Sequence, residues 1–385
     1  MYMLFSPPSI HLRKAWIALT PSLALVALLI VGLAFSSPAA AQEVSTSRPG
    51  VNITFGGEIQ PRFSYAWVED DDERLGYGVR RARLATTINL REELGAYIRF
   101  NAAAGGVAGV DAFAFYNTGD FRFRLGRFAG VQPRAHALTG GTQVDAVDRA
   151  AIGERWGSRT IGGDGRDFGI EGQWNRANTT YSLFLHGGDG NWSRARGQFR
   201  ESISSGDVTG GGSQTGMALS LGAQRTSPEV SGLSYGGFVS YNASRNPNTR
   251  AGPPGTERAY TSAGGHLYYG ATPGSQPLRG KLDLIALNYE EVGNVDESLL
   301  GISLLGAAQI HEAAEAFVRY EHEDITTTID RATQFVTAGV SFSASALDGR
   351  PYQQERITLG YMAQIPVDEG EPQQHLLVLQ LQLTF

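Results

Sequence analysis

Residues 374–385 read Gln-His-Leu-Leu-Val-Leu-Gln-Leu-Gln-Leu-Thr-Phe and end the chain. One face of this stretch carries His375, Leu377, Leu379, Leu381, Leu383 and Phe385, and the other carries Leu376, Val378, Gln380, Gln382 and Thr384. A period of two residues is typical of a β-strand, whose side chains point to alternate faces. A long apolar strand at a sheet edge invites aggregation unless another strand pairs with it. The stretch therefore indicates a closed sheet; the alternative is an edge strand of a soluble β-sandwich.

The same alternation recurs along the chain. In residues 51–69, one face carries Val51, Ile53, Phe55, Ile59, Phe63, Tyr65 and Trp67, and the other carries Asn52, Thr54, Glu58, Gln60, Arg62 and Ser64. Such a strand needs lipid or a core on one side and water on the other. The pattern predicts an all-β fold, a transmembrane antiparallel β-barrel of 16 strands. We place the strands at 51–69, 79–92, 94–104, 109–117, 120–128, 166–175, 178–187, 214–226, 232–243, 258–270, 279–291, 298–310, 312–323, 332–346, 353–365 and 373–385. Residues 279–291 alternate least cleanly.

The links between these strands alternate between short turns and longer segments. Short periplasmic turns opposite larger outer loops are typical of outer-membrane barrels. The longest link, 129–165, carries Arg134, Arg149, Arg155 and Arg159 with Asp145, Asp148 and Glu154. A loop of this length in a compact barrel is usually functional or disordered. Folded into the lumen, it would narrow a pore that 16 strands otherwise leave wide. The alternative is a surface loop that covers a subunit interface.

The first 41 residues resemble an export signal. Arg13 and Lys14 precede a largely apolar run over 17–35, and Ala39-Ala40-Ala41 provides a small-residue cleavage site. We expect cleavage after Ala41 and a barrel over 42–385; a retained membrane anchor is the alternative. The remaining 344 residues would hold 30 basic and 38 acidic residues, a formal charge of −8, and Lys281 as their only lysine.

The composition narrows the class of protein. The chain has 49 glycines among 385 residues, 18% charged residues and no cysteine. Glycine is well above the ~7% of an average protein, and no strongly basic block is present. A helical bundle, a coiled coil and a nucleic-acid binder are therefore disfavoured, and the absence of cysteine fits export through an oxidising compartment.

Arginines gather on the polar face of the N-terminal strands. Phe121, Phe123 and Leu125 need lipid, so alternation sends Arg122 and Arg124 into the lumen. The same argument gives the expected pore-lining set Arg62, Arg81, Arg83, Arg99, Arg122 and Arg124. Guanidinium groups bind phosphate and carboxylate oxygens bidentately, so such a wall attracts anions. The alternative, which can hold at the same time, is internal pairing with Glu58, Asp111 or Glu171.

Acidic residues mark a second wall. Over 312–323, alternation places Glu315, Phe317, Arg319, Glu321 and Glu323 on one side. A basic arc opposite this acidic one would create a field across the pore.

Signals for chemistry are poor. The histidines have no metal-ligand spacing, and the chain has neither a G-x-S-x-G nucleophile elbow nor a P-loop. We therefore expect no catalytic residues, no metal and no cofactor, with an outer-membrane hydrolase as the least favoured alternative.

Several motifs are similar to those of phosphate-selective porins of the O/P type. These are Gly57-Glu58-Ile59-Gln60-Pro61-Arg62, Arg80-Arg81-Ala82-Arg83-Leu84, Asp111-Ala112-Phe113, Arg124-Leu125-Gly126-Arg127-Phe128 and Gly165-Arg166-Asp167-Phe168-Gly169. The resemblance implies a homotrimer of 16-stranded barrels, each narrowed by its third outer loop, with a ladder of arginines matched here by Arg62, Arg81, Arg83, Arg122 and Arg124. The terminal Phe385 resembles the signal read by the barrel-assembly machinery. The family's phosphate channels use clustered lysines, which this chain lacks.

The sequence thus predicts a porin of the bacterial outer membrane. It would pass small hydrophilic solutes, preferentially anions, and contact membrane lipid but no nucleic acid. A barrel plugged by its loops, serving structure or surface interaction, is the second interpretation.

Overall fold

The computed structural model describes residues 43–45, 50–69, 73–103, 106–188, 218–242, 258–291, 297–326, 331–368 and 370–385. The expected signal segment, 1–41, lies outside this range. Sixteen strands form the wall: β2 (Asn52–Val68), β3 (Glu73–Asn89), β4 (Leu94–Asn101), β5 (Ala108–Thr118), β6 (Phe121–Phe128), β7 (Asp167–Arg176), β8 (Thr179–His186), β9 (Ala218–Thr226), β10 (Leu233–Asn242), β11 (Arg258–Tyr269), β12 (Leu278–Glu291), β13 (Glu297–His311), β14 (Ala314–Thr326), β15 (Arg331–Ser343), β16 (Glu355–Pro366) and β17 (Gln374–Thr384). A short strand, β1 (Glu43–Ser45), pairs with the start of β2.

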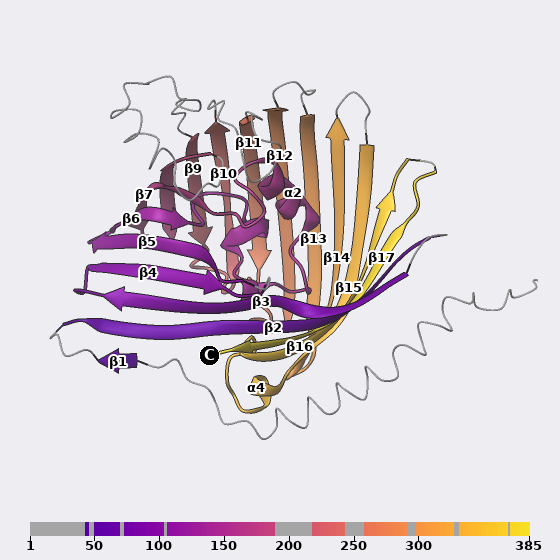
Figure 1. Ribbon diagram of the computed structural model, residues 1–385, viewed down its shortest axis with the longest axis horizontal. Coiled ribbons are helices and arrows are strands. Elements are labelled where there is room, and N and C mark those ends of the chain that lie inside the picture. Colours follow the sequence, from indigo (N-terminus) through magenta and orange to yellow (C-terminus); the bar gives the residue numbers. More distant parts are fainter. Residues whose placement is uncertain are drawn as a thin grey trace, which may run out of the picture. The chain divides into compact units, whose positions relative to one another are not determined.

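Each strand of the wall pairs antiparallel with its neighbours in the chain (Figure 1). The last strand, β17, pairs with β2, for example Leu379 with Phe63, and this pairing closes the sheet. The final residue completes the seam, because Gly57 and Phe385 exchange backbone hydrogen bonds of 2.8 and 3.1 Å. The predicted fold class, a 16-stranded antiparallel barrel, is confirmed.

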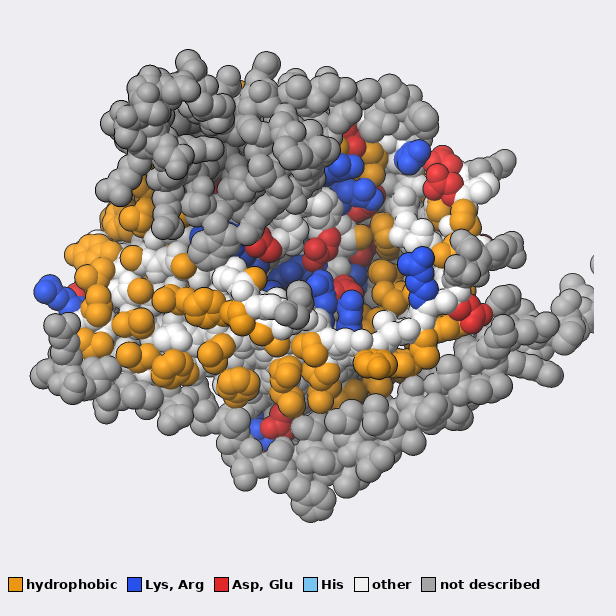
Figure 2. Space-filling model, in the orientation of Figure 1, with side chains coloured by type: hydrophobic (Ala, Val, Ile, Leu, Met, Phe, Trp, Pro, Cys, Tyr) orange, Lys and Arg blue, Asp and Glu red, His pale blue; other side chains and the backbone are white. Residues whose placement is uncertain are grey.

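The two faces of the wall differ as the alternation predicts. On β6, Phe121, Phe123 and Leu125 are exposed on the outside. Arg122 and Arg124 lie on the opposite, inner face, where Arg124 pairs with Glu171 of β7. In Figure 2, hydrophobic side chains follow the strands in bands, whereas basic and acidic side chains gather in the hollow between them. The outer apolar bands suit lipid, and the inner face is the place for polar chemistry.

Several predicted strand ends are shifted by up to three residues, and two predicted segments have a different structure. The expected loop at 70–78 is mostly strand, because β3 begins at Glu73 and its alternating Leu75 and Tyr77 pair with the end of β2. The predicted strand end at 344–346 is instead a short helix, α4 (Ala344–Leu347), which begins where the Ser343 side chain accepts a hydrogen bond from the Ala346 N–H.

The link between β6 and β7 contains two short turns of helix, η1 (Arg134–Leu138) and η2 (Gly141–Gln143), and the helix α2 (Ala151–Arg159). Helix α2 packs on the inner face of β12, β13 and β14. Its Ile152 and Trp156 are buried against Phe238, Ile285 and Leu287 of the wall. The link therefore lies in the lumen. No helix among the described residues is long and apolar enough to cross a membrane.

Candidate functional site

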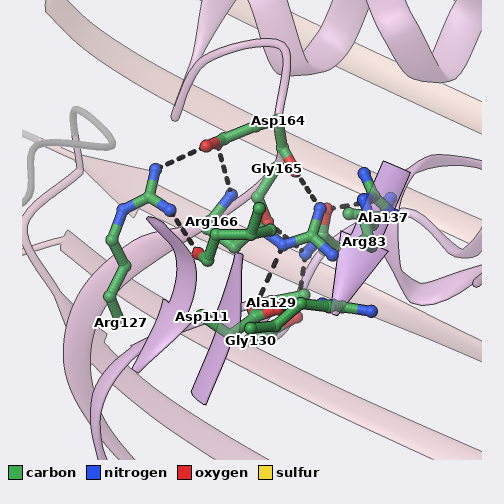
Figure 3. A network of polar contacts seen from close by, with 12 residues as sticks. Arg83, Asp111, Arg127, Ala129, Gly130, Ala137, Asp164, Gly165 and Arg166 are labelled. Carbon is green, nitrogen blue, oxygen red and sulfur yellow. Dashed lines mark hydrogen bonds and ion pairs between the residues drawn. The ribbon is translucent and has the colours of Figure 1, made fainter. Parts of the chain in front are cut away.

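The ends of the inward loop, residues 129–166, are fixed to the wall by a polar network (Figure 3). Arg127 of β6 donates to Asp164 over 2.6 Å and to the carbonyl of Val110 over 2.6 Å. Arg166 donates to Asp111 of β5 over 3.2 Å and also to the Asp164 carbonyl. Because Arg127 and Arg166 are buried, the loop leaves and rejoins the wall at defined positions.

The middle of the loop is held by its own carboxylates. Asp145 pairs with Arg279 and Lys281 of β12 at 2.5 Å each. Asp148 pairs with Arg62 of β2 at 3.2 Å and with Arg80 of β3 at 2.9 Å. These pairs connect the loop to β2 and β3 on one side and to β12 on another, which are far apart in the order of the strands.

The cations around these carboxylates keep them ionised. Burial raises the pKa of Asp148, but Arg80 and Arg62 outweigh it and the pKa lies below the usual aspartate value. The pKa of Asp145 is likewise lowered, because Lys281 and Arg279 outweigh its burial. When folding lowers the pKa of a carboxyl group, its ion pair contributes fully to stability above the pKa of the unfolded state. This contribution is lost only as the pH falls through the pKa of the folded state. The loop is therefore held at neutral pH.

The arginines of α2 face the acidic wall. Arg155 pairs with Glu323 of β14 at 3.2 Å and Arg159 with Glu297 of β13 at 3.4 Å. The Trp156 indole N–H donates to Ser262 of β11 over 3.1 Å. The loop thus presents carboxylates to basic parts of the wall and arginines to the acidic part.

The acidic wall does not face open water, and this corrects the expected field across the pore. Glu315, Glu321 and Glu323 share the inner face of β14, but all three are buried. Glu315 accepts from Arg279 over 2.9 Å, Glu321 lies 2.8 Å from Arg319, and Glu323 pairs with Arg155 of the loop. Each carboxylate is neutralised locally, Glu315 and Glu321 by arginines of the wall and Glu323 by an arginine of the loop.

The six expected arginines lie on the inner faces of the neighbouring strands β2, β3, β4 and β6. Four of them have acidic partners: Arg62 with Asp148, Arg83 with Glu58, Arg99 with Asp111, and Arg124 with Glu171. Arg81 is buried and donates to Gln60 over 2.7 Å, so it supports the wall rather than lining a path. Arg122 has no ion pair with a described residue; its guanidinium lies 5.4 Å from the centre of the Phe115 ring.

In several of these pairs the arginine stands in front of its carboxylate. The side chains of Arg99 and Asp111 are 22% and 3% exposed, and those of Arg124 and Glu171 are 15% and 2% exposed. On the opposite side, Arg155 is 33% exposed against 1% for Glu323. At these three pairs the guanidinium group is the more exposed partner, although each pair is neutral as a unit. The order is reversed at two pairs of the loop, where Asp164 and Glu154 are 41% and 35% exposed against 0% for Arg127 and 5% for Arg149.

A buried chain of polar residues joins β7 to β10. His186 lies 2.7 Å from Asp167 and 2.9 Å from Ser220, whose hydroxyl lies 2.6 Å from that of Ser240. The order resembles that of a serine hydrolase triad. Ser220 is fully buried, however, so the chain ties strands together and offers no nucleophile to a solute. The described residues contain no group of three or more acidic or histidine side chains that could hold a metal.

Known structures match this barrel in fold. No known protein family and no curated protein matches the chain in sequence. One similar structure is a loop L8 deletion mutant of OmpT, an outer membrane protein of Vibrio cholerae. The match covers 87% of this chain and 100% of the OmpT chain, at 12% identity and a TM-score of 0.62. The anion-selective porin from Comamonas acidovorans is matched over its whole length by 87% of this chain, at 14% identity and a TM-score of 0.62. The match to the outer membrane channel DcaP of Acinetobacter baumannii covers 89% of this chain and 100% of the DcaP chain, at 12% identity and a TM-score of 0.58.

The chain has the fold of outer-membrane barrels. At these identities the likeness concerns the fold alone, and the resemblance to phosphate-selective porins stays a prediction.

Sequence reasoning missed several residues of the lumen. Arg80 points inward because a bulge opposite Gln60 and Pro61 interrupts the alternation of β3, which a strict period of two cannot show. Arg279 is paired with a loop residue 134 positions away. One signal was present: residues 279–291 alternate poorly, and the inward Ile285 and Leu287 of this strand are apolar because they pack against α2.

A disulfide would test the place of α2 in the lumen. An ideal Cβ built on Gly301 of β13 lies 3.0 Å from the Cβ of Ile152, close to the ~3.5–4.5 Å of a disulfide. Because the chain has no cysteine, we expect an Ile152→Cys, Gly301→Cys variant to cross-link almost fully on oxidation, seen as a reduction-sensitive mobility shift on a denaturing gel.

The matched control is Ile152→Cys with Gly306→Cys. Gly306 is on the same strand, but its ideal Cβ has no atom within 4 Å. Equal cross-linking of the two variants, or none in the first, would contradict the position of α2.

Proposed function

We propose that this protein is a porin of the bacterial outer membrane that passes small hydrophilic solutes and prefers anions. The export signal at 1–41, a homotrimeric assembly and recognition of Phe385 by the barrel-assembly machinery belong to the same proposal. OmpT of Vibrio cholerae, which this chain matches at a TM-score of 0.54 and 11% identity, has been solved in a trimer form. Phosphate is one candidate solute, but Lys281 is paired with Asp145 and offers no lysine cluster to it.

The observation that carries the proposal is the orientation of the ion pairs. The carboxylates Asp111, Glu171 and Glu323 are at most 3% exposed, whereas their arginine partners are 15–33% exposed. In a narrow lumen with low-dielectric walls, the nearer charge dominates the potential that a solute meets. Anion preference therefore follows from the order of the charges rather than from their sum.

A barrel plugged by its loop is the second candidate. The loop hydrogen-bonds or pairs with β2, β3, β11, β12, β13 and β14. The cavity between the loop and β11–β14, lined by Tyr268, Lys281, Asp283 and Arg319, has a volume of only about 30 Å³. Conduction separates the two candidates, since a plugged barrel carries no steady current.

Neutralising two whole pairs tests the role of charge order. A variant with Arg124→Gln, Glu171→Gln, Arg155→Gln and Glu323→Gln keeps the net charge of the chain, and neither carboxylate has a second ion pair among the described residues. We expect the wild type to give a chloride-preferring reversal potential in a planar bilayer under a tenfold KCl gradient. The variant is expected to lose at least half of that potential, because the exposed guanidinium groups are gone.

The matched control is Arg350→Gln with Glu355→Gln, a pair at 2.8 Å at the start of β16. It removes one arginine–glutamate pair away from the inward loop and should leave the potential unchanged. A cation-preferring wild type would refute the anion preference, and an equal loss in both variants would refute the role of charge order.

A further inference from the structure

An arginine–aromatic strip lies on the inner faces of β4, β5 and β6. It consists of Tyr97 on β4, Phe113 and Phe115 on β5, and Arg122 and Arg124 on β6. The strand register brings them together, because Tyr97 is opposite Phe113 and Phe115 is opposite Arg124. The ring centres of Tyr97 and Phe113 are 5.3 Å apart. These three adjacent strands thus carry flat rings and planar cations side by side.

The cations of the strip already lie against its rings. The guanidinium carbon of Arg122 is 5.4 Å from the centre of the Phe115 ring, and that of Arg124 is 5.6 Å from Phe113. Such distances are within the ~6 Å range of cation–π attraction. Arg124 also lies 4.2 Å from the centre of the Phe128 ring, so both cations contact aromatic side chains of the wall.

Two features leave the strip open to a ligand. Tyr97 and Phe113 are partly exposed on the inner face, whereas Phe115 is buried beneath Arg122. Arg124 is occupied by Glu171, but among the described residues Arg122 has no ion pair and its buried Nε has no hydrogen-bond partner. The strip therefore combines a cation that has no ion pair among the described residues with partly exposed aromatic rings.

We propose that the strip binds anions that carry an aromatic ring, with aryl carboxylates as the simplest class. The carboxylate accepts hydrogen bonds from Arg122, and the ring stacks on Tyr97 and Phe113. An aliphatic acid of the same charge and size gains only the first contact, because stacking needs a ring with a π-face. This inference rests on the proposed porin function and names its preferred solute class.

The experiment compares benzoate with cyclohexanecarboxylate, which has the same charge and a ring of similar size without a π-system. The readout is the concentration of each acid that halves the chloride current through the wild-type channel in a planar bilayer. We expect benzoate to act at a concentration about two- to tenfold lower, as aromatic stacking would give. Tyr97→Leu and Phe113→Leu should each bring this ratio close to one.

The matched control is Phe123→Leu, which removes the same ring from the exposed outer face of β6 and should leave the ratio unchanged. Arg122→Gln should weaken the effect of both acids equally. Equal potency of the two acids on the wild type, or an unchanged ratio in both ring variants, would overturn the inference. A chloride-preferring reversal potential measured on the same channels would still support the porin, so the two failures are distinguishable.

Discussion

Replacing residues 133–163 by three glycines is expected to raise the single-channel conductance about threefold or more, since the lumen of a 16-stranded barrel is wide without its loop. Three glycines can span the gap, because the two ends are close together: the Gln132 side chain donates a hydrogen bond of 2.9 Å to the Gly165 carbonyl. It keeps Asp164 and Arg166, which fix the end of the loop to the wall. Conductance in a planar bilayer is the measurement.

The wall should close without the loop. Its strands pair continuously from β2 to β17, and β17 pairs back onto β2. The variant should be less stable, since Ile285 and Leu287 lose their contact with α2. Retention of the strand signature in circular dichroism is the folding control. An unchanged conductance in a folded variant would refute the constriction, and a current seen only in the variant would establish the plugged barrel.

Removing Arg279 is expected to lower the free energy of unfolding by about 3–5 kcal/mol, the range for breaking one side of a buried ion pair. This side chain is fully buried. It donates to Asp145 of the loop over 2.5 Å and to both oxygens of Glu315, over 2.9 and 2.5 Å. In Arg279→Gln, Glu315 is left as a buried carboxylate without its cation. Urea unfolding in lipid vesicles, followed by tryptophan fluorescence, measures the change.

A second substitution should restore most of the loss. In Arg279→Gln with Glu315→Gln, no charge is left alone, because Asp145 keeps Lys281 at 2.5 Å. Asp348→Asn, which removes the exposed carboxylate that pairs with Arg350 at 3.0 Å, should cost less than about 1 kcal/mol. A small effect of Arg279→Gln, or a double variant as unstable as the single one, would contradict the importance of this pair.

The strands of the wall were predictable from local sequence. An alternating segment such as Phe121–Phe128 can satisfy lipid and water in only one orientation, so each residue's face follows from its neighbours. A predicted boundary was wrong where pairing with a neighbouring strand, rather than the contrast between lipid and water, sets the strand end. Leu75 and Tyr77 are an example, because they extend β3 through pairing with β2. A bulge hid Arg80 for a related reason, because one inserted residue reverses the alternation.

The sequence by itself determined the closed 16-stranded wall and the inner position of the arginines, because both follow from a period of two residues against lipid. Only the tertiary structure decided how the lumen is filled and which charges a solute meets. Asp145 reaches Arg279, and Arg155 reaches Glu323, across more than a hundred residues. Such pairs depend on where the loop packs rather than on any local pattern. Burial behind an arginine, as for Asp111 and Glu171, is likewise a property of three-dimensional order. Which charge of a neutral pair is exposed is thus decided by the fold.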